Sequence, residues 1–229
     1  AVPLNLAAAG APADYLDTGH WSQRTITEAR RFVTVRVVAE ESASNFTTVP
    51  QPESLRFSPD AAYVHYTPNE TIGGVEFPYV PETGKVPLVA DMSSSILSRP
   101  LDVSRFGLIY AGAQKNIGPA GITVVIVRED LTGRARPGTP MVFDFRAMAE
   151  SGSMLNTPPT FGWYFAGLVF RWLKREGGLA AMERRNRAKA EALYAAIDAS
   201  SFYSNPVARN CRSWMNVPFR LAKPELDKA

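Results

Sequence analysis

The residue with the clearest chemical potential is Lys115, which stands in the string Ala-Gly-Ala-Gln-Lys-Asn-Ile-Gly-Pro-Ala-Gly directly after an apolar run. A lysine among small residues and beside apolar strands is partly desolvated, which favours its neutral, nucleophilic amine. Such an amine can form a Schiff base with a carbonyl compound. Gly112, Gly118 and Gly121 would let the backbone approach a bulky ligand closely. Taken alone, the string also fits a surface lysine in a glycine-rich turn.

A carboxylate that could cooperate with this lysine is Asp91, which ends the preceding apolar run. The interval between the two residues holds one connecting segment and one strand, so both can lie at the same edge of a sheet. A carboxylate in that place could pair with a pyridinium nitrogen and keep it protonated, which makes the ring an electron sink. The alternative interpretation is a turn or N-cap residue before Ser93, and Lys115 is what favours the first interpretation.

Four short apolar runs would position these residues as strands of one sheet. They are residues 62–66, 86–90, 107–111 and 122–127, the last composed of β-branched residues. Continuous apolar strands are typical of sheets that helices cover on both faces, so all four are expected to be buried on both faces. The first three end in small-residue or polar turns, and sites in α/β proteins gather at such strand ends.

Helical periodicity marks three further segments. Residues 21–32 place apolar side chains at three- to four-residue spacing. A second helix opens at Thr160 and is stopped by Gly177-Gly178. A third covers residues 179–199. The expected apolar stripe of the second helix consists of Phe161, Phe165, Leu168, Val169, Trp172 and Leu173.

The remaining segments carry weaker patterns. Residues 12–19 are mixed, and residues 33–60 look like short strands and loops. Residues 214–219 follow a turn and predict a strand, with which a new region of the chain would begin. We therefore expect a domain over residues 1–199 and the start of a second, smaller domain over residues 200–229.

Composition excludes several classes of function. The 229 residues include 25 basic and 22 acidic ones, and 45% are hydrophobic, which fits a globular protein and argues against disorder. A basic stretch (Arg184, Arg185, Arg187 and Lys189) fits a solvated helix face better than a nucleic-acid site. Cys211 is the single cysteine, so a disulfide within the chain is impossible, which suits a reducing cytosol. No run is long and apolar enough to predict a membrane span, and no metal is expected.

Five strings of the sequence form a recognisable set, namely Pro68-Asn-Glu-Thr-Ile-Gly-Gly74, Ala90-Asp-Met-Ser-Ser94, Leu97-Ser-Arg-Pro100, Tyr110-Ala-Gly-Ala-Gln-Lys-Asn-Ile-Gly-Pro-Ala-Gly121 and Asn156-Thr-Pro-Pro-Thr160. Together they resemble the phosphoserine aminotransferases, which belong to the class V pyridoxal-phosphate-dependent aminotransferase family. The resemblance covers essentially the whole chain, and the Ala-Gly-Ala-Gln-Lys-Asn string is specific within that broad class. It implies the large domain of the fold type I transferases, a mixed but mostly parallel sheet flanked by helices, with only the start of the small C-terminal domain.

The resemblance assigns roles to individual residues around a pyridoxal phosphate cofactor. Lys115 would carry the cofactor as a Schiff base and move the substrate's proton, and Asp91 would hold the pyridine nitrogen. Trp21 would stack on the ring, although it could equally be a core aromatic at a helix start. Thr71 would bind the ring hydroxyl side, and Gln114 would lie near the phosphate. Alternatively, Thr71 could be a turn-forming residue and Gln114 a purely structural polar residue.

The resemblance also implies a homodimer with shared active sites. Asn156 and Thr157 would reach the phosphate of the neighbouring subunit's cofactor, although they could simply cap the helix that begins at Thr160. Phe161, Trp163 and Tyr164 could pack in the dimer interface or in the core of one chain. A glycine-rich phosphate loop, a substrate-binding arginine and most of the small domain are expected outside the two ends of this chain.

The implied reaction of the complete, cytoplasmic enzyme transfers an amino group from glutamate to 3-phosphohydroxypyruvate, giving O-phosphoserine and 2-oxoglutarate. It would serve serine and pyridoxine biosynthesis, and neither nucleic acid nor membrane is an expected partner. Alternatives are an alanine–glyoxylate aminotransferase, a cysteine desulfurase using Cys211, and a truncated paralogue that only binds. A nucleotide-binding domain is disfavoured because no phosphate loop or dinucleotide motif follows a strand.

Overall fold

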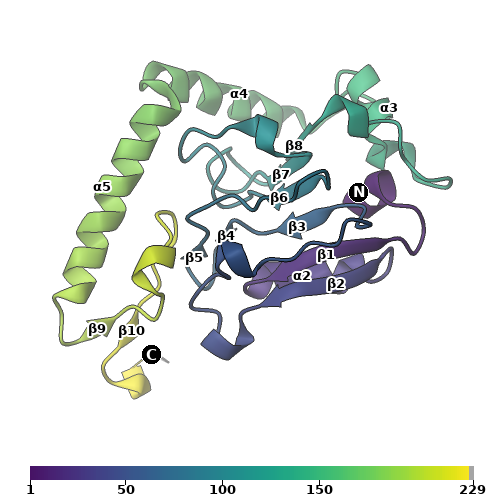
Figure 1. Ribbon diagram of the computed structural model, residues 1–229. Coiled ribbons are helices and arrows are strands. Elements are labelled where there is room, and N and C mark those ends of the chain that lie inside the picture. The colour runs from purple at the N-terminus through teal and green to yellow at the C-terminus, as the bar shows by residue number, and fades with distance from the viewer. Residues whose placement is uncertain (227–229) are drawn as a thin grey trace.

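A six-stranded sheet forms the centre of the molecule in the computed structural model, which describes residues 1–226 (Figure 1). The strands lie in the order β2-β1-β3-β6-β7-β8. All neighbouring pairs are parallel except β7 and β8, which are antiparallel. This confirms the predicted α/β class with a mixed, mostly parallel sheet. The bounds are β1 (Pro12–Asp17), β2 (Thr34–Glu40), β3 (Val64–Tyr66), β6 (Leu88–Asp91), β7 (Leu108–Gly112) and β8 (Thr123–Val127).

Side chains of the central strands alternate between two apolar clusters, one on each face of the sheet. Leu16 and Ala90 belong to one cluster, and their chain neighbours Tyr15 and Val89 belong to the other. Successive residues of a strand point to opposite faces, so only a strand covered on both sides buries both sets. The expectation of continuous apolar strands therefore holds for β3, β6 and β7, whose ends carry the predicted site residues.

Strand β1 was not predicted from the sequence pattern. Its burial is nearly complete, although it contains two aspartates. Asp14 is fully buried and accepts hydrogen bonds from Arg36 Nε at 2.9 Å and from the Ser58 amide at 2.7 Å. A charged side chain can occupy a central strand only when it is paired in this way. Composition alone does not show such pairing, which is why residues 12–19 looked mixed.

Strand β8 was expected to be buried on both faces, and that expectation is wrong. It lies at the edge of the sheet, and Val125 and Ile126 are 39% and 41% exposed. An apolar, β-branched composition fits a central and an edge strand equally well, because it reports strand propensity rather than position in the sheet. The position of a strand is fixed by pairing with distant residues.

Helices cover one face of this sheet and pass its β8 edge, while loop residues such as Leu55 and Phe77 pack on the other face. Helix α2 (His20–Ala29) follows β1 and buries Ile26 and Ala29 against one face. Helix α4 (Thr160–Arg175) runs past the β8 edge, and α5 (Gly178–Asp198) continues from it towards the C-terminal strands (Figure 1). The three predicted helices are thus present, with α2 ending earlier than expected at a turn. Two short helices, α1 (Val2–Leu6) and α3 (Phe145–Glu150), complete the set of α-helices in the described residues.

The apolar stripe predicted for α4 is mostly not buried. Of its six residues only Leu173 is buried, while Phe161 is 71% exposed. The side of α4 that packs on the chain is instead formed by Gly162 and Ala166. A methyl group on Gly162 would lie 3.5 Å from Ile122, an ordinary van der Waals contact, so this side of the helix lies close to the residue that precedes β8. Periodicity identified the apolar face of α4 but not what covers it.

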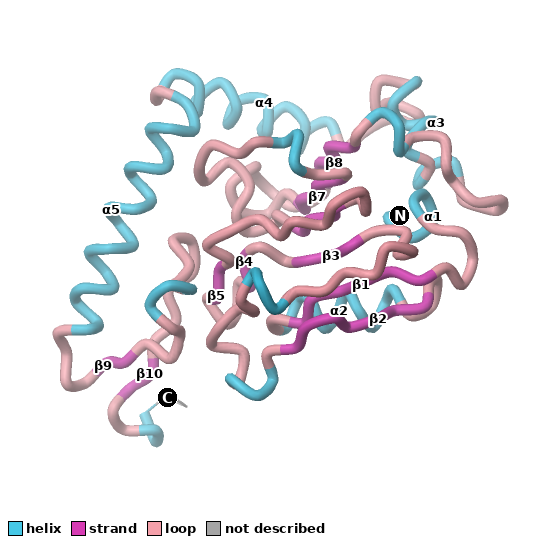
Figure 2. Tube along the Cα trace, viewed as in Figure 1, coloured by secondary structure: helices cyan, strands magenta, loops and turns pink. Residues whose placement is uncertain are grey.

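The chain after α5 is mainly loop, with two short antiparallel strands, β9 (Tyr203–Ser204) and β10 (Arg220–Leu221) (Figure 2). The strand predicted over residues 214–219 is absent. The amide of Trp214 donates to Glu76, and the next two amides donate to Ser213 Oγ at 3.0 Å, so these amides have partners outside any sheet. A second small hairpin pairs β4 (Asn69–Glu70) with β5 (Val75–Glu76). Within residues 1–226, no helix combines the length and apolar character needed to cross a membrane.

Candidate functional site

A cavity opens where β3, β6 and β7 end, at the carboxyl edge of the parallel strands. Sites in α/β proteins gather at this edge because the loops there converge. The cavity brings together five residues that the sequence singled out, from segments far apart in the chain. They are Trp21, Thr71, Asp91, Gln114 and Lys115. Four further lining residues were not predicted, namely Thr67, Asn69, Ser93 and Ser94.

The side chain of Lys115 reaches back across the cavity to the β4–β5 hairpin. Its Nζ donates a hydrogen bond to Thr71 Oγ1 at 2.6 Å. Burial lowers the pKa of the Lys115 amine, and the negative charge of Asp91 acts in the opposite direction. The lysine is therefore held at a defined place in the cavity and is more easily deprotonated than a free lysine. These are the properties that an amine nucleophile needs.

Asp91 is fixed by the turn that follows its strand. Its Oδ1 accepts hydrogen bonds from the amide of Ser93 at 3.0 Å and from the Ser93 hydroxyl at 2.6 Å. Ser93 Oγ in turn accepts from the amide of Gly112 at the end of β7, at 3.0 Å. Asp91 thus has the turn-capping role of the alternative interpretation, and this role does not exclude a second role in the cavity. Because both bonds engage one oxygen, the carboxylate keeps acceptor capacity for a group in the cavity.

Trp21 is positioned by a buried carboxylate, Glu70, which the sequence did not point to. Glu70 Oε2 accepts from the Trp21 amide and Oε1 from the Ser22 amide, each at 2.9 Å. A negative charge at the first turn of a helix satisfies free amides and complements the helix dipole. A side chain at Gly19 would lie 2.8 Å from Glu70 Cδ, so glycine is needed there. Burial raises the pKa of Glu70, and the two amide hydrogen bonds oppose this shift.

Three buried polar atoms at the cavity have no partner within the described chain. They are Trp21 Nε1, Thr67 Oγ1 and Asn69 Oδ1. Buried polar groups are nearly always hydrogen-bonded, since an unsatisfied one costs roughly 1–3 kcal/mol. One donor, one hydroxyl and one acceptor around a single cavity therefore indicate a polar ligand. Trp21 adds an aromatic surface on which a flat ring can stack.

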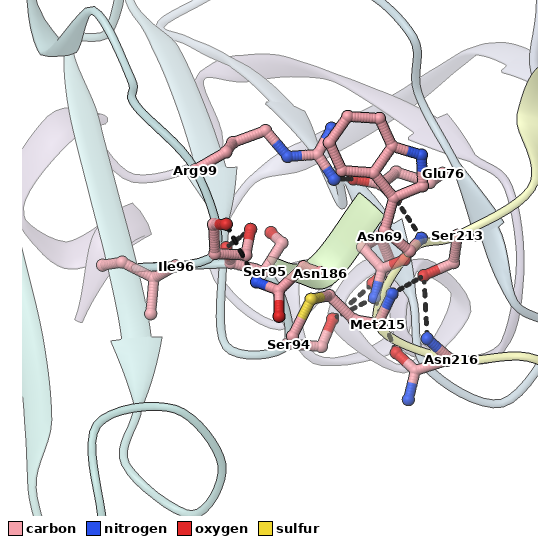
Figure 3. Close-up of polar contacts among 12 residues, drawn as sticks. Asn69, Glu76, Ser94, Ser95, Ile96, Arg99, Asn186, Ser213, Met215 and Asn216 are labelled. Atoms are coloured by element: carbon pink, nitrogen blue, oxygen red, sulfur yellow. Dashed lines mark hydrogen bonds and ion pairs between the residues drawn. The ribbon is translucent and has the colours of Figure 1, made fainter. Parts of the chain in front are cut away.

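Asn69 connects the cavity to the C-terminal segment (Figure 3). Its Nδ2 donates to Ser94 Oγ and to Asn216 Oδ1, both at 2.8 Å, and Ser94 Oγ donates back to the Asn69 carbonyl at 2.8 Å. Both hydrogens of the amide are used, which fixes its orientation and leaves Oδ1 as the free acceptor. Beside this contact, Glu76 accepts from Arg99 at 2.5 Å and from the Trp214 amide at 2.9 Å. The segment around residue 214 is therefore bound to the wall of the site.

Two of the predicted site residues lie elsewhere. Asn156 and Thr157 are exposed in the loop before α4 and line a different hollow, together with Ile122 and Trp163. Within one chain the structure does not bring them to Lys115. Their predicted role concerned the cofactor of a neighbouring subunit, so it stays a prediction.

Cys211 does not have the features of a reactive cysteine. Its side chain is buried, and burial raises the pKa of its thiol. A nucleophilic thiol needs the opposite, an accessible position and a lowered pKa. The site therefore gives no support to the desulfurase alternative.

Comparison with known proteins gives one consistent result. The sequence profile of the family described as Aminotransferase class-V matches residues 1–229. The phosphoserine aminotransferase of Azotobacter vinelandii is 62% identical over 227 residues, which cover 99% of this chain and 63% of the relative. That of Ectopseudomonas mendocina is 60% identical over 228 residues, with 100% and 63% covered. The chain thus spans about 63% of the length of the curated relatives that it matches.

Solved structures agree with the sequence relatives. Phosphoserine aminotransferase from Bacillus circulans subsp. alkalophilus superposes with a TM-score of 0.96 at 45% identity, covering 99% of this chain and 63% of that chain. The phosphoserine aminotransferase of Trichomonas vaginalis, described as bound to pyridoxal phosphate, gives 0.90 at 41% identity, with 96% and 62% covered. An alanine–glyoxylate aminotransferase from Nostoc sp. gives 0.70 at 16% identity, with 93% and 60% covered, and so shows only the shared fold.

Proposed function

This chain belongs to the class-V aminotransferase family, and we propose that the whole protein is a pyridoxal-phosphate-dependent phosphoserine aminotransferase. It would transfer the amino group of glutamate to 3-phosphohydroxypyruvate and release O-phosphoserine and 2-oxoglutarate, a step of serine biosynthesis. One observation carries the proposal. A lysine amine, a fixed carboxylate and an aromatic ring converge on one cavity, and residues that line it carry unsatisfied polar atoms.

The residues of the cavity fit pyridoxal phosphate. Trp21 offers its indole as a stacking surface for a flat ring. The unpaired Trp21 Nε1, Thr67 Oγ1 and Asn69 Oδ1 belong to residues that line the cavity, and they suit a ring with polar substituents. Asp91 would pair with the ring nitrogen, Thr71 would bind on the ring hydroxyl side, and Gln114 would lie near the phosphate. Lys115 would hold the cofactor covalently through its amine. When bound, the cofactor supplies an electron sink that stabilises negative charge at the substrate Cα.

The chain's own groups then carry the proton chemistry. The carboxylate of Asp91, held by Ser93, would keep a proton on the ring nitrogen because its negative charge favours a cation beside it. The Lys115 amine, once free, would take the proton from the substrate Cα and return it at the cofactor. Its lowered pKa makes the neutral form available for this base role. Thr71 would orient that amine between the two positions.

Substrate choice is supported by the relatives rather than by the cavity itself. Curated relatives about 60% identical to this chain are named phosphoserine aminotransferases. The alternative, an alanine–glyoxylate aminotransferase, shares only the fold. Full-length protein that carries this sequence should be assayed with glutamate as donor and with 3-phosphohydroxypyruvate or glyoxylate as acceptor. The proposal expects kcat/KM to favour 3-phosphohydroxypyruvate by at least about a hundredfold, and a preference for glyoxylate would overturn it.

A homodimer with shared active sites is the assembly that we propose. The exposed aromatic side chains of α4, including Phe161 and Tyr164, supply an apolar surface that a second subunit could cover. Asn156 and Thr157 precede that surface in an exposed loop, which suits a contact with the partner's cofactor phosphate. We also propose residues 1–199 as the cofactor-binding domain and residues 200–229 as the start of a smaller one. A cytoplasmic location suits the single, reduced cysteine.

A further inference from the structure

Asn69 is a buried residue of the cavity whose side-chain amide is only half used by the chain itself. It lines the cavity and is 1% exposed. Both hydrogens of its Nδ2 have partners, Ser94 Oγ and Asn216 Oδ1, each at 2.8 Å (Figure 3). Its Oδ1 has no partner within residues 1–226. Because buried amide oxygens are nearly always hydrogen-bonded, this acceptor indicates a ligand that carries a donor.

The direction of the Asn69 amide depends on both neighbours. The Ser94 hydroxyl donates to the Asn69 backbone carbonyl at 2.8 Å, so its oxygen accepts from the Asn69 side chain. A serine hydroxyl can also rotate and donate, which means that Ser94 alone does not fix the amide. Without Asn216, one buried N–H of Asn69 would lose its partner. The amide would relieve this loss by turning over, with Ser94 donating to Oδ1 and Nδ2 replacing Oδ1 as the group available to a ligand.

Asn216 is itself held firmly, through the buried residue Ser213. Ser213 Oγ accepts from the Asn216 amide at 3.0 Å. The Ser213 amide donates to the Gly74 carbonyl, in the turn between β4 and β5, at 2.9 Å. The Ser213 carbonyl accepts from the hydroxyl of Tyr194 on α5 at 2.8 Å. The segment that carries Asn216 is therefore hydrogen-bonded both to a helix and to the hairpin that contains Asn69.

We propose that Asn69 is a further cofactor-binding residue, whose Oδ1 accepts a hydrogen bond from a donor group of the cofactor, and that Asn216 is the positioning residue that fixes Oδ1 in this direction. The inference deepens the proposed function and rests on it. An amide whose two hydrogens are both used can only accept, so the matching ligand group must be a donor. The amine form of the cofactor, pyridoxamine phosphate, carries such donors in its amino group and its ring hydroxyl. The C-terminal segment thus contributes to the site although Asn216 does not line the cavity.

The experiment measures the Kd of pyridoxamine phosphate for full-length, cofactor-free protein by isothermal titration calorimetry. This probe has no carbonyl group, so it forms no Schiff base with the lysine and its Kd reports non-covalent contacts. Asn69→Ala removes the acceptor. Asn216→Leu removes the partner of Asn69 at similar size, whereas Asn216→Asp keeps an acceptor and, since a carboxylate cannot donate, disfavours the turned amide.

The matched control is Asn205→Leu. Asn205 lies in the same C-terminal segment, and its side chain donates to the Pro218 carbonyl and accepts from the Val207 amide. It does not line the cavity. This variant therefore removes an asparagine that stabilises the segment without touching Asn69. Urea unfolding shows that each variant is folded and how much stability it has lost.

We expect Asn69→Ala and Asn216→Leu each to raise the Kd of pyridoxamine phosphate by about tenfold, the effect of one lost hydrogen bond. Asn216→Asp and Asn205→Leu should stay within about twofold of wild type. In the Asn69→Ala background, Asn216→Leu should have no further effect on the Kd, because Asn216 acts through Asn69. A residue that only stabilised the fold would not show this dependence on Asn69.

Three results would overturn the inference. They are an unchanged Kd in folded Asn69→Ala or Asn216→Leu, equal increases in Asn216→Leu and Asn205→Leu, and additive effects in the double variant. If Asn216→Leu does not fold, Asn216→Ala replaces it under the same criteria. Wild-type protein that binds no pyridoxamine phosphate would instead refute the proposed function, and this inference with it.

Discussion

The amine of Lys115 lies 2.6 Å from the hydroxyl oxygen of Thr71, although the two residues are 44 positions apart in the sequence. Lys115 follows β7, and Thr71 follows β4. A loop lysine has many rotamers, and a single hydrogen bond to a fixed hydroxyl selects among them. The contact shows how the carboxyl edge of the sheet gives one amine a defined place.

Replacing Thr71 tests this positioning. Thr71→Val removes the hydroxyl at nearly constant volume, so Lys115 loses its acceptor. We expect turnover to fall by about tenfold, which corresponds to ~1.4 kcal/mol, the upper end of the range for one hydrogen bond between neutral groups. Thr71→Ser keeps the hydroxyl and should stay within about twofold of wild type. Steady-state kinetics of the two variants decide, and equal rates in Thr71→Val and wild type would contradict the positioning role.

Replacing Asp91 tests the carboxylate. Asp91→Ala should weaken binding of pyridoxal phosphate by at least about tenfold, because the ring nitrogen loses its partner. It should also slow proton transfer at the substrate Cα, seen as a larger isotope effect with Cα-deuterated glutamate. The substitution also removes the acceptor for Ser93, at roughly 1 kcal/mol of folding stability. Asp102→Ala is the control, because it removes the same kind of hydrogen bond, from the Ser104 amide, in an exposed turn outside the cavity. It therefore shows the effect of a lost turn hydrogen bond without the loss of a cavity carboxylate. Equal cofactor affinity in both variants would disprove the role of Asp91.

Glu70 should give the folded protein a characteristic pH dependence. Burial raises its pKa above the ordinary 4.5, so the unfolded chain loses this proton first as the pH rises. The contribution of Glu70 to the free energy of unfolding is therefore fully present below 4.5 and is lost as the pH rises through its folded pKa. Between about pH 4 and pH 7, the free energy of unfolding should therefore fall more for the wild type than for Glu70→Gln. Urea unfolding of both proteins measures the difference, and Glu82→Gln, at an exposed position, is the control.

Parallel pH profiles for wild type and Glu70→Gln would contradict that account. They would mean that the amide hydrogen bonds from Trp21 and Ser22 fully offset the burial of the carboxylate.

The sequence predicted the reactive part of the site better than its supporting part. Lys115 and Asp91 could be found because they directly follow apolar strands, and parallel strands end at one edge of a sheet. Asn69 and Glu70 were missed as individual residues, although they lie inside a motif that was noticed. In sequence they resemble turn residues. Only the fold shows that both are buried, at 1% exposure each, with partners in distant segments.

The fold, too, was predicted only in part. Apolar runs revealed β3, β6 and β7, but β1 remained hidden because Asp14 is neutralised by Arg36, 22 positions away. The β-branched composition of β8 and the apolar stripe of α4 were read correctly as strand and helix. Their exposure could not be read, because burial depends on what packs against an element and not on its own sequence.

The exposed face of α4 leads to a prediction about assembly. Tyr164→Asp places a charge on the apolar surface that we propose for the dimer contact, where it would be desolvated without a partner. We expect the molar mass of the full-length protein in light scattering to fall from dimer to monomer. Val103→Asp, at an exposed apolar position far from α4 in sequence, should leave the mass unchanged. A dimer in both variants would refute this contact surface.

The central claim, that Lys115 holds the cofactor, can be tested chemically. Full-length protein is incubated with pyridoxal phosphate, reduced with borohydride and digested, and the modified peptide is identified by mass spectrometry. We expect a pyridoxyl phosphate adduct on Lys115 in the wild type. In Lys115→Ala we expect no specific adduct and a loss of turnover by roughly 10⁴-fold. Lys85→Ala, at an exposed lysine, should behave as wild type. An adduct on another lysine, or near-normal turnover of Lys115→Ala, would contradict the account.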